Sequence, residues 1–172
     1  MKFQIRHEFD APRSKVEEAM FHPDFPAFLL ERHGVLLEVE PKDRQESDRE
    51  IRRKVRYRPK PVIGSIGPKK VPPEWFAFNE ESTWDKQGHK LTFKNVPTSQ
   101  SISRMVINQG TISLKELGAN RTERVTEGDL RLDLPFLLRP LGLIGERVIH
   151  SEAVKLLDAE ARVLREWLKE KA

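Results

Sequence analysis

The sequence contains no cysteine, and its aromatic content is low, with 8% aromatic residues and a single tyrosine. The absence of cysteine excludes a disulfide framework and a thiolate metal site, and it fits a reducing, cytoplasmic environment. A long apolar run is missing as well. A membrane-spanning helix needs roughly 20 mostly apolar residues, whereas the most apolar stretch, Leu132–Ile149, is bracketed and interrupted by arginines at positions 131, 139 and 147. The first residues, MKFQIRHEFD, hold no apolar run behind their positive charge, so no secretory signal is expected.

The charge balance is only mildly basic. The 172 residues carry 31 basic and 27 acidic side chains, a formal net charge of +4. Such a surplus is too small to indicate nucleic-acid binding, and no nucleic-acid partner is expected. No repeat or linker interrupts the chain, so residues 1–172 are expected to form one domain with a sizeable core. The sequence predicts no particular oligomeric state.

Periodicity predicts the order of the elements. The first strand alternates, with one apolar face formed by Phe3, Ile5, His7 and Phe9. Proline and glycine then delimit two short helices, in APRSKVEEAMFH and PAFLLERHG. Strand-like runs follow, among them WFAFNEESTWD, KLTFKNV, SISRMVIN and TISLKEL, and a long helical pattern extends from Pro140 to the C-terminus. This order indicates an α+β layout with the helices gathered on one face of an antiparallel sheet.

Three segments carry a resemblance to a known family. They are the N-terminal MKFQIRHEFDAPRSKVEEAMFHPDF, the internal EWFAFNEESTWD and the C-terminal GDLRLDLPFLLRPLGLIGERVI with LLDAEARVLREWL. They are similar to an uncharacterised bacterial family within the START-like (SRPBCC) superfamily, and the resemblance spans essentially the whole chain. It implies the helix-grip fold, in which a curved antiparallel sheet of about seven strands wraps around a long C-terminal helix, with two short helices after the first strand. Members of the superfamily bind lipids, sterols, quinones or polyketides, and some serve only as protein-binding modules. They share no catalytic residue set, so the resemblance transfers none.

A bowed sheet that grips one helix leaves a gap suited to an apolar ligand. The residues expected to line this gap are His7, Arg53, Tyr57, Trp75, Leu132, Leu134, Leu141, Gly142 and Gly145. The two glycines lie three positions apart and so share a helix face. Their missing side chains either leave room for a ligand or permit close packing at the corner between strand and helix.

Two polar residues fall on predicted inner faces. A neutral imidazole at His7 would either bind a ligand hydroxyl and transfer protons near neutral pH or, more commonly for a lone inward histidine, be held structurally by hydrogen bonds. Arg53 lies between Ile51 and Val55, and a buried guanidinium needs a partner. Glu81 or a ligand carboxylate would supply one, unless a bend turns Arg53 to solvent. Trp75 belongs to an aromatic-rich run that forms either plain core or a stacking platform. No pair of histidines has the spacing of metal ligands, and no cofactor is expected.

A row of basic residues occupies the other face of the same predicted strand. It comprises Arg52, Lys54, Arg56 and Arg58. The row either makes transient contact with an anionic membrane surface or is neutralised by carboxylates of the neighbouring strand, Glu38 and Glu40, and the charge-paired interpretation is favoured.

The loop PKPVIGSIGPKKVPP places Val62, Ile63 and Ile66 between proline and glycine hinges. Long loops of this kind often cover binding sites, so the segment is expected to be a lid over the mouth of the gap, with a short helix packed on the core as the alternative.

Three functions remain open at this point. The favoured one is binding or transport of a hydrophobic small molecule (a lipid, a sterol-like compound, a quinone or a polyketide) without chemistry. The second is an enzyme of the cyclase or hydratase type, in which His7 or a carboxylate in the gap serves as the acid–base group. The third is a protein-interaction module that uses the sheet face and has a filled interior.

Overall fold

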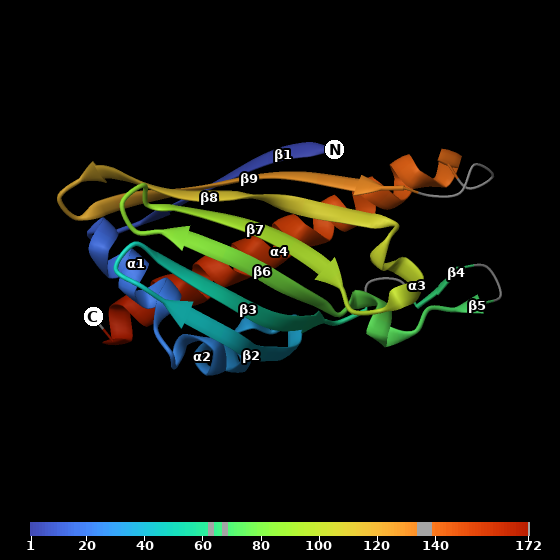
Figure 1. Ribbon diagram of the computed structural model, residues 1–172, viewed down its shortest axis with the longest axis horizontal. Helices are drawn as coiled ribbons and strands as arrows, with labels where there is room; N and C mark the ends of the chain where they lie inside the picture. Colours follow the sequence, from blue (N-terminus) through green and yellow to red (C-terminus); the bar gives the residue numbers. More distant parts are fainter. Residues whose placement is uncertain (62–63, 67–68, 134–138, 172) are drawn as a thin grey trace.

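The computed structural model describes residues 1–171 apart from 62–63, 67–68 and 134–138. The main sheet consists of β1 (Lys2–Phe9), β2 (Leu36–Glu46), β3 (Glu50–Pro59), β6 (Phe78–Asp85), β7 (Lys90–Pro97), β8 (Val106–Gly118) and β9 (Arg121–Leu132). These seven strands are antiparallel and lie in the order β1-β9-β8-β7-β6-β3-β2, so the first strand pairs with the last (Figure 1). A separate ribbon pairs β4 (Ser65–Ile66) with β5 (Lys69–Lys70).

The helices lie on one side of this sheet. Two short helices, α1 (Arg13–Phe21) and α2 (Phe25–His33), connect β1 to β2. Pro12 precedes α1, and Gly34 ends α2 with a φ of 79°, a left-handed conformation that favours glycine. The long helix α4 (Arg139–Lys171) runs obliquely behind the strands in Figure 1. This architecture confirms the predicted helix-grip fold. Across the described part of the chain, no helix is both long enough and apolar enough to span a membrane.

The hydrophobic core gathers at one end of the sheet. There α1, α2 and the C-terminal part of α4 pack against the inner face, and Trp84 and Leu164 are fully buried. Trp167 of α4 receives the ring edges of Phe25 and Phe28 at centroid distances of 5.6 and 5.0 Å. In contrast, no residue from 145 to 160 of α4 is fully buried. The helix is therefore packed tightly against its surroundings at its C-terminal end and loosely before it.

Two predictions of local structure were wrong. Trp75 and Phe76 do not belong to a strand but to a short 3₁₀ helix, η1 (Pro73–Phe76), and β6 begins only at Phe78. The prolines at positions 72 and 73 lack the N–H donors that a strand ladder requires, and proline suits the first turn of a helix. The start of SISRMVIN likewise forms a helical turn, α3 (Gln100–Ser103), and β8 follows it as one long strand.

Two glycines let β8 and β9 approach closely. Gly110 and Gly128 are cross-strand partners. A Cβ atom on Gly110 would lie 2.0 Å from the carbonyl oxygen of Glu127, which is backbone and cannot move aside. A Cβ atom on Gly128 would lie 2.3 Å from the ring of Phe3. Any side chain at position 110 would therefore clash with the backbone of β9, and any side chain at position 128 would clash with Phe3 of β1.

We expect Gly110→Ala to lower the free energy of unfolding by about 1–3 kcal/mol, because the added methyl group overpacks a rigid backbone contact. Urea denaturation followed by circular dichroism would measure the change. Gly118→Ala is the matched control, since a Cβ atom there meets nothing within 4 Å, and its effect should stay within about 0.5 kcal/mol. Equal urea midpoints for the two variants would contradict the close-approach explanation.

Candidate functional site

Three polar side chains lie side by side on the inner face of the sheet. They are Glu80 on β6, Asn95 on β7 and Asn108 on β8, and we call them the polar row. The strand register pairs Glu80 with Asn95 and Asn95 with Asn108. At the same level, the row is flanked by the buried apolar residues Val55 on β3 and Leu130 on β9. Three adjacent polar side chains thus lie in one line across the sheet between two buried apolar residues.

The polar row is poorly satisfied by the protein itself. The Oδ1 atoms of Asn95 and Asn108 are buried and have no hydrogen-bond partner among the described residues. Each buried acceptor left in this way costs about 1–3 kcal/mol. Glu80 forms an ion pair with Nη2 of Arg53, but the distance is long, at 3.4 Å. The arrangement is therefore unfavourable unless water or a ligand supplies the missing hydrogen bonds.

An aromatic pair lies beside the polar row. Tyr57 on β3 and Phe78 on β6 stack with ring centroids 5.5 Å apart and an interplanar angle of 26°. Burial raises the pKa of Tyr57 above its usual range, and it also raises the pKa of Glu80. Yet the side chain of Glu80 remains 17% exposed, and Tyr57 is only partly buried. These groups are thus deep in the protein while still bordering accessible space, as expected of residues that line an interior site.

Arg53 faces inward as predicted, but its carboxylate partner is Glu80 rather than Glu81. Neighbouring residues in a strand point to opposite faces, so Glu81 lies on the outer face and pairs with Lys54 instead. The guanidinium of Arg53 also donates to the Ser82 hydroxyl and to the backbone oxygen of Met20, at 3.3 and 3.1 Å.

His7 is held by hydrogen bonds at both ring nitrogens. Its Nε2 lies 2.8 Å from Oδ1 of Asp158 on α4, and its Nδ1 lies 3.3 Å from Nη2 of Arg124 on β9. Because the guanidinium can only donate, Nδ1 is the acceptor and the proton sits on Nε2. Burial lowers the pKa of His7, and the hydrogen bond to Asp158 opposes this only in part. The imidazole is therefore neutral and engaged, at a distance from the polar row along the sheet.

The remaining predicted lining residues are scattered. Leu132 fills the space beside Gly145, where a Cβ atom would lie 2.7 Å from Cδ1 of that leucine. Close packing, rather than room for a ligand, accounts for this glycine. Trp75 is half-buried in η1. Leu134, Val62 and Ile63 lie outside the described residues, and of Leu141, Gly142 and Ile66 only the backbone is described, in α4 and β4.

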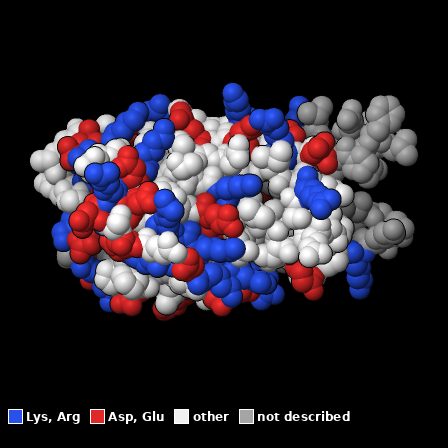
Figure 2. All heavy atoms as spheres, viewed as in Figure 1, with Lys and Arg blue, Asp and Glu red and all other residues white. Residues whose placement is uncertain are grey.

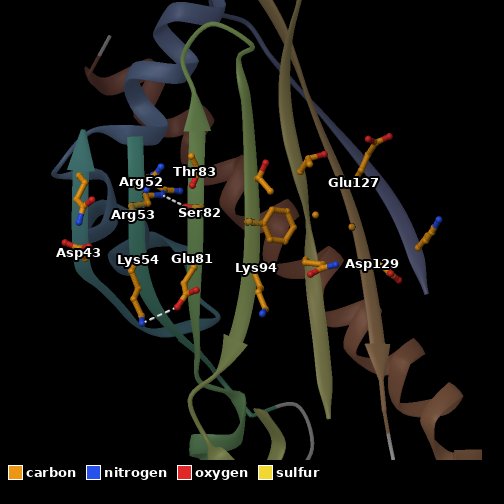
Figure 3. A pocket seen from close by; sticks show the side chains of 18 residues that line it. Asp43, Arg52, Arg53, Lys54, Glu81, Ser82, Thr83, Lys94, Glu127 and Asp129 are labelled. Carbon is orange, nitrogen blue, oxygen red and sulfur yellow. Dashed lines mark hydrogen bonds and ion pairs between the residues drawn. The ribbon is translucent and has the colours of Figure 1, made fainter. Parts of the chain in front are cut away.

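A hollow lined by described residues lies on the opposite, outer face of the sheet. Its volume is about 930 Å³, and Figure 3 shows it with α4 behind the strands. Three cross-strand threonines, Thr83, Thr92 and Thr111, form its floor. Charged side chains of both signs, including Lys94 and Asp129, surround it. An open hollow rimmed by charges of both signs is poorly suited to enclose an apolar molecule.

The basic row on this outer face is neutralised, as the charge-paired interpretation predicts. Arg56 and Arg58 both contact Glu38, at 3.0 and 3.2 Å, and Lys54 contacts Glu81 at 3.3 Å. Figure 2 shows Lys and Arg intermingled with Asp and Glu over this side of the molecule. The outer face therefore presents no large patch of a single charge in that view.

The residues of the polar row were not among those expected to line the gap, although the sequence pattern marks two of them. Glu80 shares the period of Phe78 and Trp84, and Asn95 shares that of Leu91 and Phe93. A polar residue in phase with an apolar face is a recognisable anomaly. What strand periodicity could not show was that the anomalies on three strands meet at one level of the sheet.

Comparison with solved structures defines the class of protein. The fold resembles an aromatase/cyclase, Zhui, from Streptomyces sp. R1128, with 14% identity, a TM-score of 0.66 and coverage of 98% of this chain and 95% of that one. It also resembles a START superfamily protein from Mycobacterium smegmatis (13% identity, TM-score 0.56, 99% of each chain). A third similar structure is norcoclaurine synthase from Thalictrum flavum in complex with dopamine and hydroxybenzaldehyde (12% identity, TM-score 0.59, coverage 100% and 90%). At these identities the likenesses show the fold alone, a START-like helix-grip fold.

The family can be stated more narrowly. Residues 4–168 match the family described as "Protein of unknown function (DUF2505)", and the chain belongs to that family. No curated protein matches the sequence. The solved relatives of this fold include cyclase and synthase enzymes as well as a START protein, so the fold is compatible with both ligand binding and catalysis.

The neutral state of buried histidines predicts how stability depends on pH. His7 and His33 both have a pKa lowered from 6.5 by burial. Below about pH 6.5 these histidines are protonated in the unfolded chain but remain largely neutral in the native state. The free energy of unfolding should therefore fall as the pH drops from about 7.5 to about 5.5. Urea titrations across this range would measure the slope.

His7→Gln should flatten this slope, because the carboxamide can replace both hydrogen bonds without titrating. His22→Gln, at a histidine whose side chain is 38% exposed, is the control and should leave the slope unchanged. An identical slope in His7→Gln and the unmodified protein would show that His7 is not among the groups kept neutral.

Proposed function

We propose that the protein binds a hydrophobic small molecule in the interior between the sheet and α4, with the polar row as the part of the site that recognises the ligand's polar group. The observation that carries this proposal is that the buried Oδ1 atoms of Asn95 and Asn108, beside Glu80, have no hydrogen-bond partner among the described residues. Carriage without chemistry is the simplest activity of such a site.

The distribution of packing supports an interior ligand. The inner face is filled by α1, α2 and the C-terminal part of α4 at one end, where Trp84 and Leu164 are fully buried. Beside the polar row, the aromatic pair Tyr57 and Phe78 is only partly buried, and no residue of α4 from 145 to 160 is fully buried. An apolar body resting on the aromatic pair would bury more of this surface, and each Å² of apolar surface removed from water contributes about 25 cal/mol.

A second candidate function is acid–base catalysis by Glu80. Burial raises the pKa of Glu80, which favours the protonated carboxyl and suits it to exchange a proton with a bound substrate. His7 is less suited to this role, because both of its ring nitrogens are engaged. If Glu80 is catalytic, replacing it should reduce the rate of turnover more than it reduces the affinity for the substrate.

Native mass spectrometry of the purified protein tests the carrier proposal directly. We expect a co-purified small molecule that survives gentle desolvation and is released on unfolding. An aromatic dye such as 1-aminoanthracene should bind with increased fluorescence, and the released molecule should displace it. A protein that neither carries a small molecule nor binds the dye would contradict the proposal.

Replacing the amides separates a binding role from a structural one. Asn108→Leu should raise the free energy of unfolding by about 1 kcal/mol, because an unsatisfied polar group is replaced by an apolar side chain of similar size. The same variant should weaken dye binding by about tenfold, the equivalent of one lost hydrogen bond. Thermal melts and fluorescence titration would measure the two effects.

Gln109→Leu is the matched control, because Gln109 is exposed on the outer face of the same strand. It should leave dye affinity unchanged. A destabilised Asn108→Leu variant with normal dye affinity would mean that the amide stabilises the fold rather than the ligand.

A further inference from the structure

We infer that the interior site selects molecules whose polar group donates hydrogen bonds, a hydroxyl or a protonated amine on an apolar body, and rejects carboxylates such as fatty acids. This inference rests on the proposed function and narrows its ligand class. Three features of the described residues support it: the inward cations are already bound, the available groups are acceptors, and two carboxylates lie near one another.

Arg53, the inward-facing arginine beside the polar row, has all three of its side-chain nitrogens engaged with the protein. Arg53 donates to Ser82, to the backbone of Met20 and to Glu80, and its guanidinium also lies over the ring of Phe21 at 4.9 Å. Arg124 has no exposed surface and contacts Glu160 on α4 at 3.2 Å. A ligand carboxylate at the polar row would have to displace a partner of Arg53, and displacing Glu80 would leave that carboxylate buried without its counter-ion.

The groups that remain available accept hydrogen bonds. Glu80 forms its ion pair through Oε1. The buried Oδ1 atoms of Asn95 and Asn108 are acceptors without a donor among the described residues. A carboxamide can rotate to present its NH₂ group instead of its oxygen. The carboxyl of Glu80 at the end of the row still favours a ligand group that donates a hydrogen bond. An ammonium group between Glu80 and Asn95 could donate to both acceptors at once, and a hydroxyl could donate to one of them.

The electrostatic environment disfavours an anion. Glu160 of α4 is close enough that its charge raises the pKa of both Glu80 and Tyr57. Glu80 is paired with Arg53 and Glu160 with Arg124, so a carboxylate ligand would add an unbalanced negative charge beside these carboxylates. An ammonium group could donate directly to Glu80, and an alcohol would leave the charge balance unaltered. Ligands with only acceptor atoms, such as quinones, would leave the amide and carboxyl oxygens unsatisfied.

A displacement experiment with three molecules of equal chain length tests the inference. 1-Aminoanthracene is bound to the protein at neutral pH and competed with dodecanol, dodecylamine and dodecanoate. We expect the alcohol and the amine to displace the dye at concentrations about tenfold lower than the carboxylate, since a hydrogen bond to a charged group is worth roughly this factor or more. Comparison of the alcohol with the amine shows whether the preferred donor is neutral or charged.

Glu80→Gln should abolish the advantage of dodecylamine over dodecanoate. Glu81→Gln is the matched control, because Glu81 is the neighbouring residue on the outer face, paired with Lys54, and it should leave all three affinities unchanged. Asn95→Leu provides a second variant in case Glu80→Gln fails to fold, and it should lower the affinity for dodecanol.

The outcomes distinguish the two proposals. Displacement by dodecanoate at concentrations equal to or below those of the amine and the alcohol would overturn the selectivity while leaving an interior binding site in place. Absence of dye binding to the unmodified protein would overturn the binding site itself, and the selectivity with it.

Discussion

The position of α4 depends on one buried charge. Arg124 on β9 has no exposed surface, and its guanidinium contacts the carboxylate of Glu160 at 3.2 Å, the ring of His7 at 3.3 Å and the backbone oxygen of Leu157 at 3.5 Å. Removing one partner of a buried ion pair typically costs about 3–5 kcal/mol. Sliding or rotating α4 would break several of these contacts together. The helix is therefore held in one register on the β1–β9 side of the sheet.

This attachment divides the inner face of the sheet into two regions. Beyond Glu160, α4 meets α1 and α2, and Ala161, Leu164 and Trp167 complete a dense core. Before Glu160 the helix follows β1 and β9, as the contacts of His150 with Phe3 and of Gly145 with Leu132 show. The polar row lies away from those contacts, on β6 to β8. A polar strip in such a position lowers stability, and proteins commonly retain such conflicts where a site needs them.

Most of the fold could be predicted from local patterns, because alternation and helix boundaries are local properties. The alternating residues Phe3 to Phe9 form β1, and Gly34 ends α2 as expected. The errors have local causes too: consecutive prolines turned the Trp75 segment into a 3₁₀ helix. The candidate site was harder to predict. Alternation with Ile51 and Val55 places Arg53 and Tyr57 on the predicted inner face, but Glu80, Asn95 and Asn108 become neighbours only through the pairing of three strands.

Alternate residues of the same strands form the inner and the outer face of the sheet. Glu80 and Glu81 are adjacent in sequence, yet the first borders the interior and the second pairs with Lys54 on the outer face. Asn108 and Gln109 are divided in the same way. The outer hollow, with its threonine floor and mixed charges, suits a polar partner surface better than an apolar ligand. Because strand alternation separates the faces residue by residue, a function of the interior and one of the outer face can be disrupted independently. The interior is the stronger candidate, because two buried amide oxygens, on Asn95 and Asn108, lack a partner among the described residues and lie beside a carboxyl group and an aromatic pair.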